Sequence, residues 1–505
     1  MKTGQTTLLV LIIAIALAIR ALGIEARPIW YDEAFSLLLS EKGPAGILAG
    51  TLSTTGGAAA DIHPPAYYFS LWVWINIFGQ SVLAARFLSI LASLLSIVAG
   101  YCLAKDVFNS RVAFLSAALL AIAPFQFHYG QEIRMYSFLT LWLIAAVYAY
   151  RKGAATHKTK WWILFAISTA LAQYTHNLSV FFLVPLALSP LWKQDWKTLR
   201  SVILAGIAAA LLYLPWLIHL PNQFMKIQHG YWIEHPGFER IITLLLSFVT
   251  NLPLPGGWLL PGLSATLFIV AISLWQTIRF IRDSTTQKLF IRADKALWML
   301  YLAFGPALLL FLISQWRPVY IERGLVASGA IFWIWVAWVL SETRLPKAML
   351  VLTVFAILSG SGIGIYQHLT YQNFPYAPYR VINEHIRERF TPGDVIIHSN
   401  KLSMLPALYY SPDLPQTFIA DPPGSGTDTL DQATQSALGI SAAPDIQFAS
   451  GKAGRIWLII FARAIDEYQH EGYATHPHLA WLDQNYHLEN IWIFNDIHLH
   501  LYSRP

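Results

Sequence analysis

Long apolar segments, repeated along most of the chain, limit this sequence to folds that suit a lipid environment. A membrane-spanning helix needs roughly 20 apolar residues to cross about 30 Å of hydrocarbon. With 56% hydrophobic and 12% charged residues, the chain is predicted to be a mainly α-helical integral membrane protein. The candidate spans, about eleven in number, lie near 7–24, 83–104, 112–127, 134–150, 161–175, 178–192, 201–219, 258–278, 296–314, 324–341 and 348–366.

Lysine and arginine residues gather in alternate loops between these segments, at 105–111, 151–160, 193–200 and 279–295. Loops with such an excess of positive charge face the cytoplasm. The N-terminus is therefore predicted to be cytoplasmic and the C-terminal tail extracytoplasmic. The net charge of +6 is explained by this topology, so no nucleic-acid partner is expected.

Two regions outside the spans carry structure of their own. In the outer loop 25–82, tyrosine and tryptophan crowd the stretch 66–78, which predicts a helix lying at the membrane interface. After about residue 370 the apolar runs give way to short strand-like segments at 394–398, 416–420, 455–461 and 497–502. We predict a transmembrane domain over 1–369 and a small soluble α/β domain over 370–505.

Finer features of the C-terminal segment follow from local patterns. Helical periodicity is expected at 379–390 and 477–486. The alternation at 497–502 predicts a half-buried strand. The stretch 421–445, rich in Gly, Ser, Thr, Asp and Pro, is expected to be a surface loop.

The adjacent carboxylates Asp32 and Glu33 follow the first span in an aromatic setting. Ionisable groups at a membrane boundary suggest function, because burying them without partners is costly. The alternative is that they stand in water or stabilise the start of the next helix.

Further polar residues are predicted to face outward at the same membrane level. Arginine offers a fixed fork of donors that suits phosphate oxygens, although any single arginine could instead extend to the lipid headgroups. Together the acids and arginines favour an anionic ligand. These outward residues are His63, Arg86, Glu132, Arg134, Tyr136, Arg317, Tyr320 and Arg323.

The order of the motifs resembles glycosyltransferase family 39 and its relatives of the GT-C superfamily. The motifs are Asp-Glu after the first span, His-Pro-Pro-x-Tyr-Tyr from His63, Ala-Arg-Phe around Arg86, and Tyr-x-Gln-Glu-x-Arg-x-Tyr up to Tyr136. This superfamily includes protein O-mannosyltransferases and the enzyme that adds aminoarabinose to lipid A. The resemblance covers roughly residues 1–345.

The resemblance implies a GT-C-type helical bundle in a bacterial-type plasma membrane, with a polyprenyl-phosphate sugar as donor. A hexosyl or pentosyl group would pass, with inversion, to a lipid, glycan or protein acceptor at the outer surface. Asp32 would then be the base, with Glu33 as its neighbour and Glu132 as the second acidic element.

The reaction also needs cations to neutralise the phosphate leaving group. We expect Arg86, Arg134, Arg317 and Arg323 to bind the donor phosphate, and His63, Tyr136 and Tyr320 to bind substrate. No cofactor is required, although a divalent metal ion is an alternative source of positive charge. The rival function is a transporter or flippase of an anionic lipid-linked sugar, which would usually show inverted repeats and charges at the midplane.

Overall fold

The computed structural model describes the chain from Thr3 to Pro505 except for positions 53, 56–57, 60–62, 222–232 and 422–428. The chain forms two compact units whose segments interleave along the sequence. The first comprises Met1–Ile24, Arg86–Ile218 and Ile233–Leu369; the second comprises Glu25–Ala85, His219–Trp232 and Thr370–Pro505. The division at 369/370 expected from the sequence stays a prediction, because these units are not continuous in the chain.

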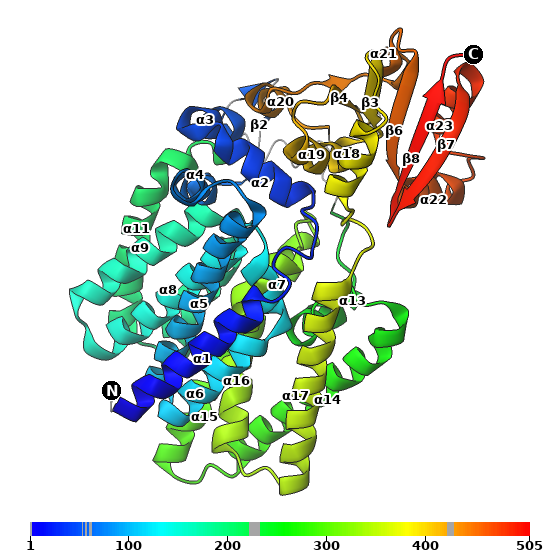
Figure 1. Cartoon of the computed structure of the whole chain (residues 1–505). Helices are drawn as coiled ribbons and strands as arrows, with labels where there is room; N and C mark the ends of the chain where they lie inside the picture. Colours follow the sequence, from blue (N-terminus) through cyan, green and yellow to red (C-terminus); the bar gives the residue numbers. More distant parts are fainter. Residues whose placement is uncertain (1–2, 53, 56–57, 60–62, 222–232, 422–428) are drawn as a thin grey trace. The chain divides into compact units, whose positions relative to one another are not determined.

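Helices make up the first unit, and most of them run alongside one another (Figure 1). Their α-helical members are α1 (Thr3–Ala21), α5 (Val82–Val107), α6 (Ser110–Ile122), α7 (Pro124–Gln131), α8 (Tyr136–Thr156), α9 (Thr159–Thr175), α10 (Val180–Leu188), α11 (Trp196–Leu217), α13 (Glu239–Val249), α14 (Gly256–Arg282), α15 (Gln287–Ser314), α16 (Val326–Glu342) and α17 (Lys347–Thr370). Short 3₁₀ helices are η1 (Asn177–Ser179), η2 (Ser189–Lys193) and η3 (Glu322–Leu325).

Every segment expected to be a span is mainly helical, but the count of eleven is not confirmed. Within the described residues, seven helices are long and apolar enough to cross a membrane, and the bent pair α6–α7 gives an eighth. The helices α9 and α10 are shorter than a full span. The chain is an integral membrane protein on the strength of these long apolar helices.

The helix α16 of the first unit is buried at every residue from Val326 to Val339. Trp333, Trp335 and Trp338 are almost fully buried on it. A helix that is apolar on all sides is covered either by lipid or by other helices, and the burial of α16 inside the protein indicates the second case. The two buried indole N–H groups of Trp333 and Trp335 donate to Phe248 O and Thr277 Oγ1, each at 3.1 Å.

The second unit combines helices from the outer loop with a mixed α/β segment (Figure 1). The outer loop contributes α2 (Tyr31–Glu41), α3 (Gly43–Leu52), β1 (Thr54–Thr55), β2 (Ala58–Ala59) and α4 (Ala66–Phe78). The predicted helix at 66–78 is therefore present, while its position at the interface stays a prediction. The helices of the C-terminal segment are α18 (Tyr379–Arg387), α19 (Lys401–Tyr410), α20 (Gln432–Leu438), α21 (Ile446–Ser450), α22 (Ala462–His470) and α23 (Pro477–Asn485).

A six-stranded sheet with the order β5-β4-β3-β6-β8-β7 organises the C-terminal segment. Its strands are β3 (Asp394–His398), β4 (Gln416–Ile419), β5 (Ala442–Ala443), β6 (Arg455–Phe461), β7 (His487–Phe494) and β8 (Ile497–Ser503). The first four in spatial order pair in parallel, whereas β8 and β7 add antiparallel strands at one side. The expected α/β character is confirmed.

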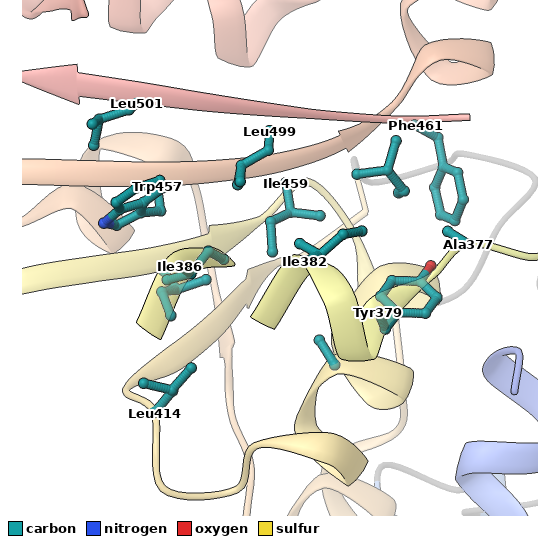
Figure 2. Close-up of a cluster of buried hydrophobic side chains, with 13 residues drawn as sticks. Ala377, Tyr379, Ile382, Ile386, Leu414, Trp457, Ile459, Phe461, Leu499 and Leu501 are labelled. Atoms are coloured by element: carbon teal, nitrogen blue, oxygen red, sulfur yellow. The ribbon is translucent and has the colours of Figure 1, made fainter. Parts of the chain in front are cut away.

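Alternate residues of β6 supply cores on both faces of this sheet, since successive side chains of a strand point to opposite sides. Figure 2 shows Trp457 and Ile459 packed with Ile382 and Ile386 of α18. On the other face, Leu458 packs in the cluster that includes Leu482 of α23.

Two expectations for the C-terminal segment are wrong in detail. The strand β8 is buried on both faces rather than half-buried, because β7 covers its edge and helices cover its faces. The stretch 421–445 contains α20 and β5, although part of it, 422–428, lies outside the described residues.

Candidate active site

A bend between α6 and α7 positions the Gln-Glu-x-Arg motif in the first unit. The two helices meet at 57°, and Pro124 at the start of α7 has no N–H to donate to the carbonyl of Leu120. Arg20 of α1 donates instead, from Nη2 to Leu120 O at 3.2 Å and from Nη1 to Ala121 O at 2.9 Å. The fully buried Arg20 therefore caps α6 where its carbonyls lack helical partners.

Gln131, the last residue of α7, caps the C-terminal end of α1. Its amide nitrogen donates to Arg20 O at 2.6 Å and to Leu22 O at 3.0 Å, where α1 ends. Its amide oxygen, which can only accept a hydrogen bond, lies 2.6 Å from Nε2 of His368, so Nε2 is the donor. Nδ1 of His368 lies 3.1 Å from Nδ1 of His128. The end of α7 is therefore tied to both α1 and α17.

Glu132 and Arg134 occupy the turn that follows α7. Their side chains belong to residues that are only 7% and 2% exposed, and the N–H of Arg134 donates to Glu132 O at 2.7 Å. Such burial excludes an arginine that extends to the headgroups. Charged groups held in a protein interior are compensated by other charges or hydrogen bonds, so the surrounding structure holds the charged groups of this turn in place.

Arg323 reaches the same region from η3. Its guanidinium carbon stands 5.7 Å from the ring centroid of Tyr136, the first residue of α8. The Tyr136 ring lies 5.8 Å from that of His176. The structure thus brings together Arg323 and the Glu132–Tyr136 turn, which are far apart in sequence.

The other predicted residues of the first unit have different surroundings. Arg86 is buried and donates from Nη1 to Ile24 O at 2.5 Å. Tyr320 is also buried, with its ring 6.3 Å from that of Phe311. Arg317 is exposed, which fits the alternative in which an arginine extends towards the headgroups.

Asp32 and Glu33 lie in the first turn of α2, in the second unit. Carboxylates are favoured there by the helix dipole, so their position has a local structural cause. Glu33 is 2% exposed, whereas Asp32 is half-buried. His63, also half-buried, lies shortly before α4.

Tyr376 of the C-terminal segment contacts residues that shortly precede these acids in the chain. The guanidinium of Arg27 stands 3.7 Å from the ring centroid of Tyr376, and the ring of Trp30 lies 6.1 Å from it. Nζ of Lys401 lies 5.9 Å from the ring centroid of Tyr31, which directly precedes Asp32. The sequence analysis missed Arg20, Tyr376 and Lys401. A charged residue inside an apolar span was an available signal for Arg20, but no local pattern marks the other two.

Among the residues that the structure describes, no group of three or more His, Cys, Asp or Glu side chains is arranged to hold a metal ion. The carboxylates that the sequence predicted for catalysis are Asp32 and Glu33 in the second unit and Glu132 in the first. Oxygen ligands of this kind suit Mg²⁺ and Mn²⁺, so metal dependence stays a prediction to be tested.

Part of the chain is similar in sequence to a known family and to individual known enzymes. The family described as dolichyl-phosphate-mannose-protein mannosyltransferase matches residues 62–219. An undecaprenyl phosphate-alpha-4-amino-4-deoxy-L-arabinose arabinosyl transferase from Proteus mirabilis is 29% identical over 178 residues, which cover 32% of each chain. The matched segment thus spans about a third of that relative's length.

Solved structures extend the likeness to the whole chain. ArnT from Cupriavidus metallidurans bound to undecaprenyl phosphate is 13% identical, with a TM-score of 0.65, and the match covers 99% of this chain and 98% of that one. The chain has the GT-C fold. The archaeal oligosaccharyltransferase AglB from Archaeoglobus fulgidus, in complex with an inhibitory peptide and a dolichol-phosphate, matches with a TM-score of 0.55 at 14% identity, over 100% of this chain and 74% of that one.

The resemblance predicted from the order of the motifs is therefore confirmed, and so is the predicted GT-C architecture. The structural likeness extends beyond the predicted range 1–345, because the match to ArnT covers 99% of this chain and so includes the α/β segment. At this low sequence identity the likeness establishes the fold, while the roles of individual residues depend on their chemistry in this chain.

Proposed function

We propose that this protein transfers a sugar from a polyprenyl-phosphate carrier to a lipid, glycan or protein acceptor at the outer surface of the membrane. The observation that carries the proposal is the pair of arginines around Tyr136. Arg134 is 2% exposed, two residues before Tyr136, and Arg323 stands 5.7 Å from its ring. Arg323 is half-buried, and guanidinium groups shielded from water in this way are suited to a phosphate ester that enters from the bilayer.

In this reaction the bond between the anomeric carbon and the phosphate oxygen breaks while the acceptor oxygen bonds to that carbon from the opposite face. The configuration is therefore inverted. Polyprenyl phosphate leaves with increased negative charge, which Arg134, Arg323 and Arg86 would stabilise. Arg317, being exposed, would act earlier, by attracting the anionic donor.

Asp32 would take the proton of the acceptor hydroxyl, since a carboxylate within reach of the nucleophile is a general base. Glu33 and Glu132 would orient cations or sugar hydroxyls. Tyr136 and Tyr320 offer aromatic faces for a sugar ring, and His63 offers a ring nitrogen to a hydroxyl.

Relatives support a lipid-linked donor. Undecaprenyl phosphate and dolichol-phosphate are named in the structures of ArnT and AglB, and the relative from Proteus mirabilis is named as an arabinosyl transferase. We infer from these relatives that the donor is a polyprenyl-phosphate sugar that carries either a hexosyl or a pentosyl group. A divalent metal is an alternative source of the positive charge supplied here by arginines.

Purified protein should be incubated with a panel of labelled polyprenyl-phosphate sugars and candidate acceptors. We expect transfer from one donor, loss of transfer in Arg134→Gln and a smaller effect in Arg317→Gln, whose side chain is exposed. If a labelled lipid-linked sugar moves across the membrane of proteoliposomes and no sugar is transferred, the protein is a transporter or flippase instead.

A further inference from the structure

The helix that carries Asp32 and Glu33 is covered by the C-terminal segment. All residues of α2 from Glu33 to Ser40 are buried. Four helices of the second unit pack against α2, namely α3 and α4 of the outer loop and α19 and α20 of the C-terminal segment. Figure 1 shows α19 beside α2. The environment of these acids is therefore built partly by residues after position 400.

Lys401 is the one charged residue along the full described length of these four helices. The other titratable groups that α4 and α19 carry are tyrosines, Tyr67, Tyr68, Tyr409 and Tyr410. On α2 itself the only further carboxylate is Glu41, at the opposite end from Asp32. Among these four helices, only Lys401 can therefore place a positive charge beside Asp32 and Glu33.

The position of Lys401 is unfavourable for a cation on local grounds. It is the first residue of α19, after Asn400, whose side chain accepts from the N–H of Leu402 at 3.0 Å. The positive end of the helix dipole disfavours a cation there. Lys401 is also only 9% exposed, and burying an ammonium group without compensation is strongly unfavourable. Contacts of its side chain must offset both costs.

Those contacts include the residue next to the acids. Nζ of Lys401 lies 5.9 Å from the ring centroid of Tyr31, which is followed directly by Asp32 and Glu33. A cation near an aromatic ring gains only modest stabilisation, which is too little to offset a buried ammonium group by itself. A carboxylate partner supplies the larger compensation.

We propose that Lys401 is the cationic partner of the Asp32–Glu33 pair, so that the C-terminal segment contributes a positioning residue to the site. The inference rests on the proposed function for its catalytic meaning, but the pairing itself does not. A cation beside a carboxylate favours the ionised form. Lys401 would thereby keep Asp32 ready to accept a proton and hold the first turn of α2 against α19.

The pairing is tested first without any activity. Thermal unfolding of the full-length protein in detergent is compared for Lys401→Gln, Asp32→Asn, Glu33→Gln and the two double variants with Lys401→Gln. We expect Lys401→Gln to lower the unfolding midpoint of the wild type clearly more than that of at least one acid variant. Equal losses in all three backgrounds would overturn the pairing.

The catalytic consequence is tested by the pH profile of kcat/KM. In Lys401→Gln the acid limb should move up by about one pH unit, while Lys401→Arg should retain the wild-type profile. The matched control is Lys452→Gln, at an exposed lysine of the same segment, which should leave the profile unchanged. An unshifted acid limb in folded Lys401→Gln would overturn the positioning role. If no lipid-linked sugar is transferred by the wild type, the proposed function fails and the unfolding comparison alone decides the inference.

Discussion

Arg20 of α1 caps the end of α6, and Gln131 of the adjoining α7 caps the end of α1. Arg20 donates to the carbonyls of Leu120 and Ala121 at the end of α6, and Gln131 donates to Arg20 O and Leu22 O at the end of α1. Carbonyls at helix ends need partners when they are buried. This exchange fixes the direction in which α7 leaves the bend and hence the turn that holds Glu132 and Arg134.

Arg20→Gln should therefore destabilise the protein by about 2–3 kcal/mol, because a shortened side chain leaves buried carbonyls without donors. Arg20→Lys should lie between this variant and the wild type, since one ammonium group cannot reproduce the fork of donors. Unfolding in detergent measures both. The control is Arg200→Gln at an exposed position; equal stability of the Arg20 and Arg200 variants would contradict the capping role.

Gln131 and His368 should be energetically coupled, because their side chains are joined at 2.6 Å. In a double-mutant cycle of Gln131→Ala and His368→Ala, the combined loss of stability should differ from the sum of the single losses by about 0.5–3 kcal/mol. Strict additivity would indicate that the bond contributes nothing to holding α7 against α17.

Asp32→Asn should abolish sugar transfer while the protein stays folded and binds the carrier lipid, since the amide keeps the shape but cannot accept the proton. Transfer and carrier binding are measured on the same preparation. Activity above about a tenth of wild type, a loss of only about 1.4 kcal/mol in transition-state stabilisation, would exclude Asp32 as the base.

The loop charges predict the orientation of the chain. An accessibility tag placed after Pro505 should react from outside intact cells, whereas a tag between Arg151 and Lys160 should react only after permeabilisation. The reverse labelling pattern would contradict both the topology and a reaction at the outer surface.

The C-terminal segment should lose stability in mild acid. Burial lowers the pKa of His500 to about 4, and neither of its ring nitrogens has a hydrogen-bond partner among the described residues. The unfolded chain therefore binds a proton that the folded chain does not. The stability contributed by the neutral ring is present above about pH 6.5 and is lost as the pH falls towards 4.

His500→Phe should reduce this acid sensitivity and raise stability at pH 7 by about 1–2 kcal/mol, because an unsatisfied buried polar group is removed. The phenyl ring can keep the stacking with Tyr502, whose ring centroid lies 6.1 Å away. Unfolding midpoints at pH 7 and pH 5 test this. An unchanged difference between the two pH values would show that His500 does not titrate on unfolding.

The sequence by itself determined the lipid environment, the helical character of the spans and the positions of most strands. The length of an apolar run predicts a membrane span, and alternation of apolar and polar residues predicts a strand. Both patterns can be read from the sequence because they depend on neighbours along the chain. The strands β3 and β6 begin and end where the sequence predicts them. β7, α19 and α22 were missed, because their stability comes from packing that local patterns do not record.

The acids and arginines of the candidate site could also be recognised from the order of their motifs. Only the tertiary structure separated buried Arg134 from exposed Arg317, since burial depends on how helices assemble. It also brought Lys401 to Tyr31 and Arg20 to the end of α6. Such contacts join distant parts of the chain, and a hydrogen bond or charge interaction depends on distance in space, which separation along the sequence does not fix.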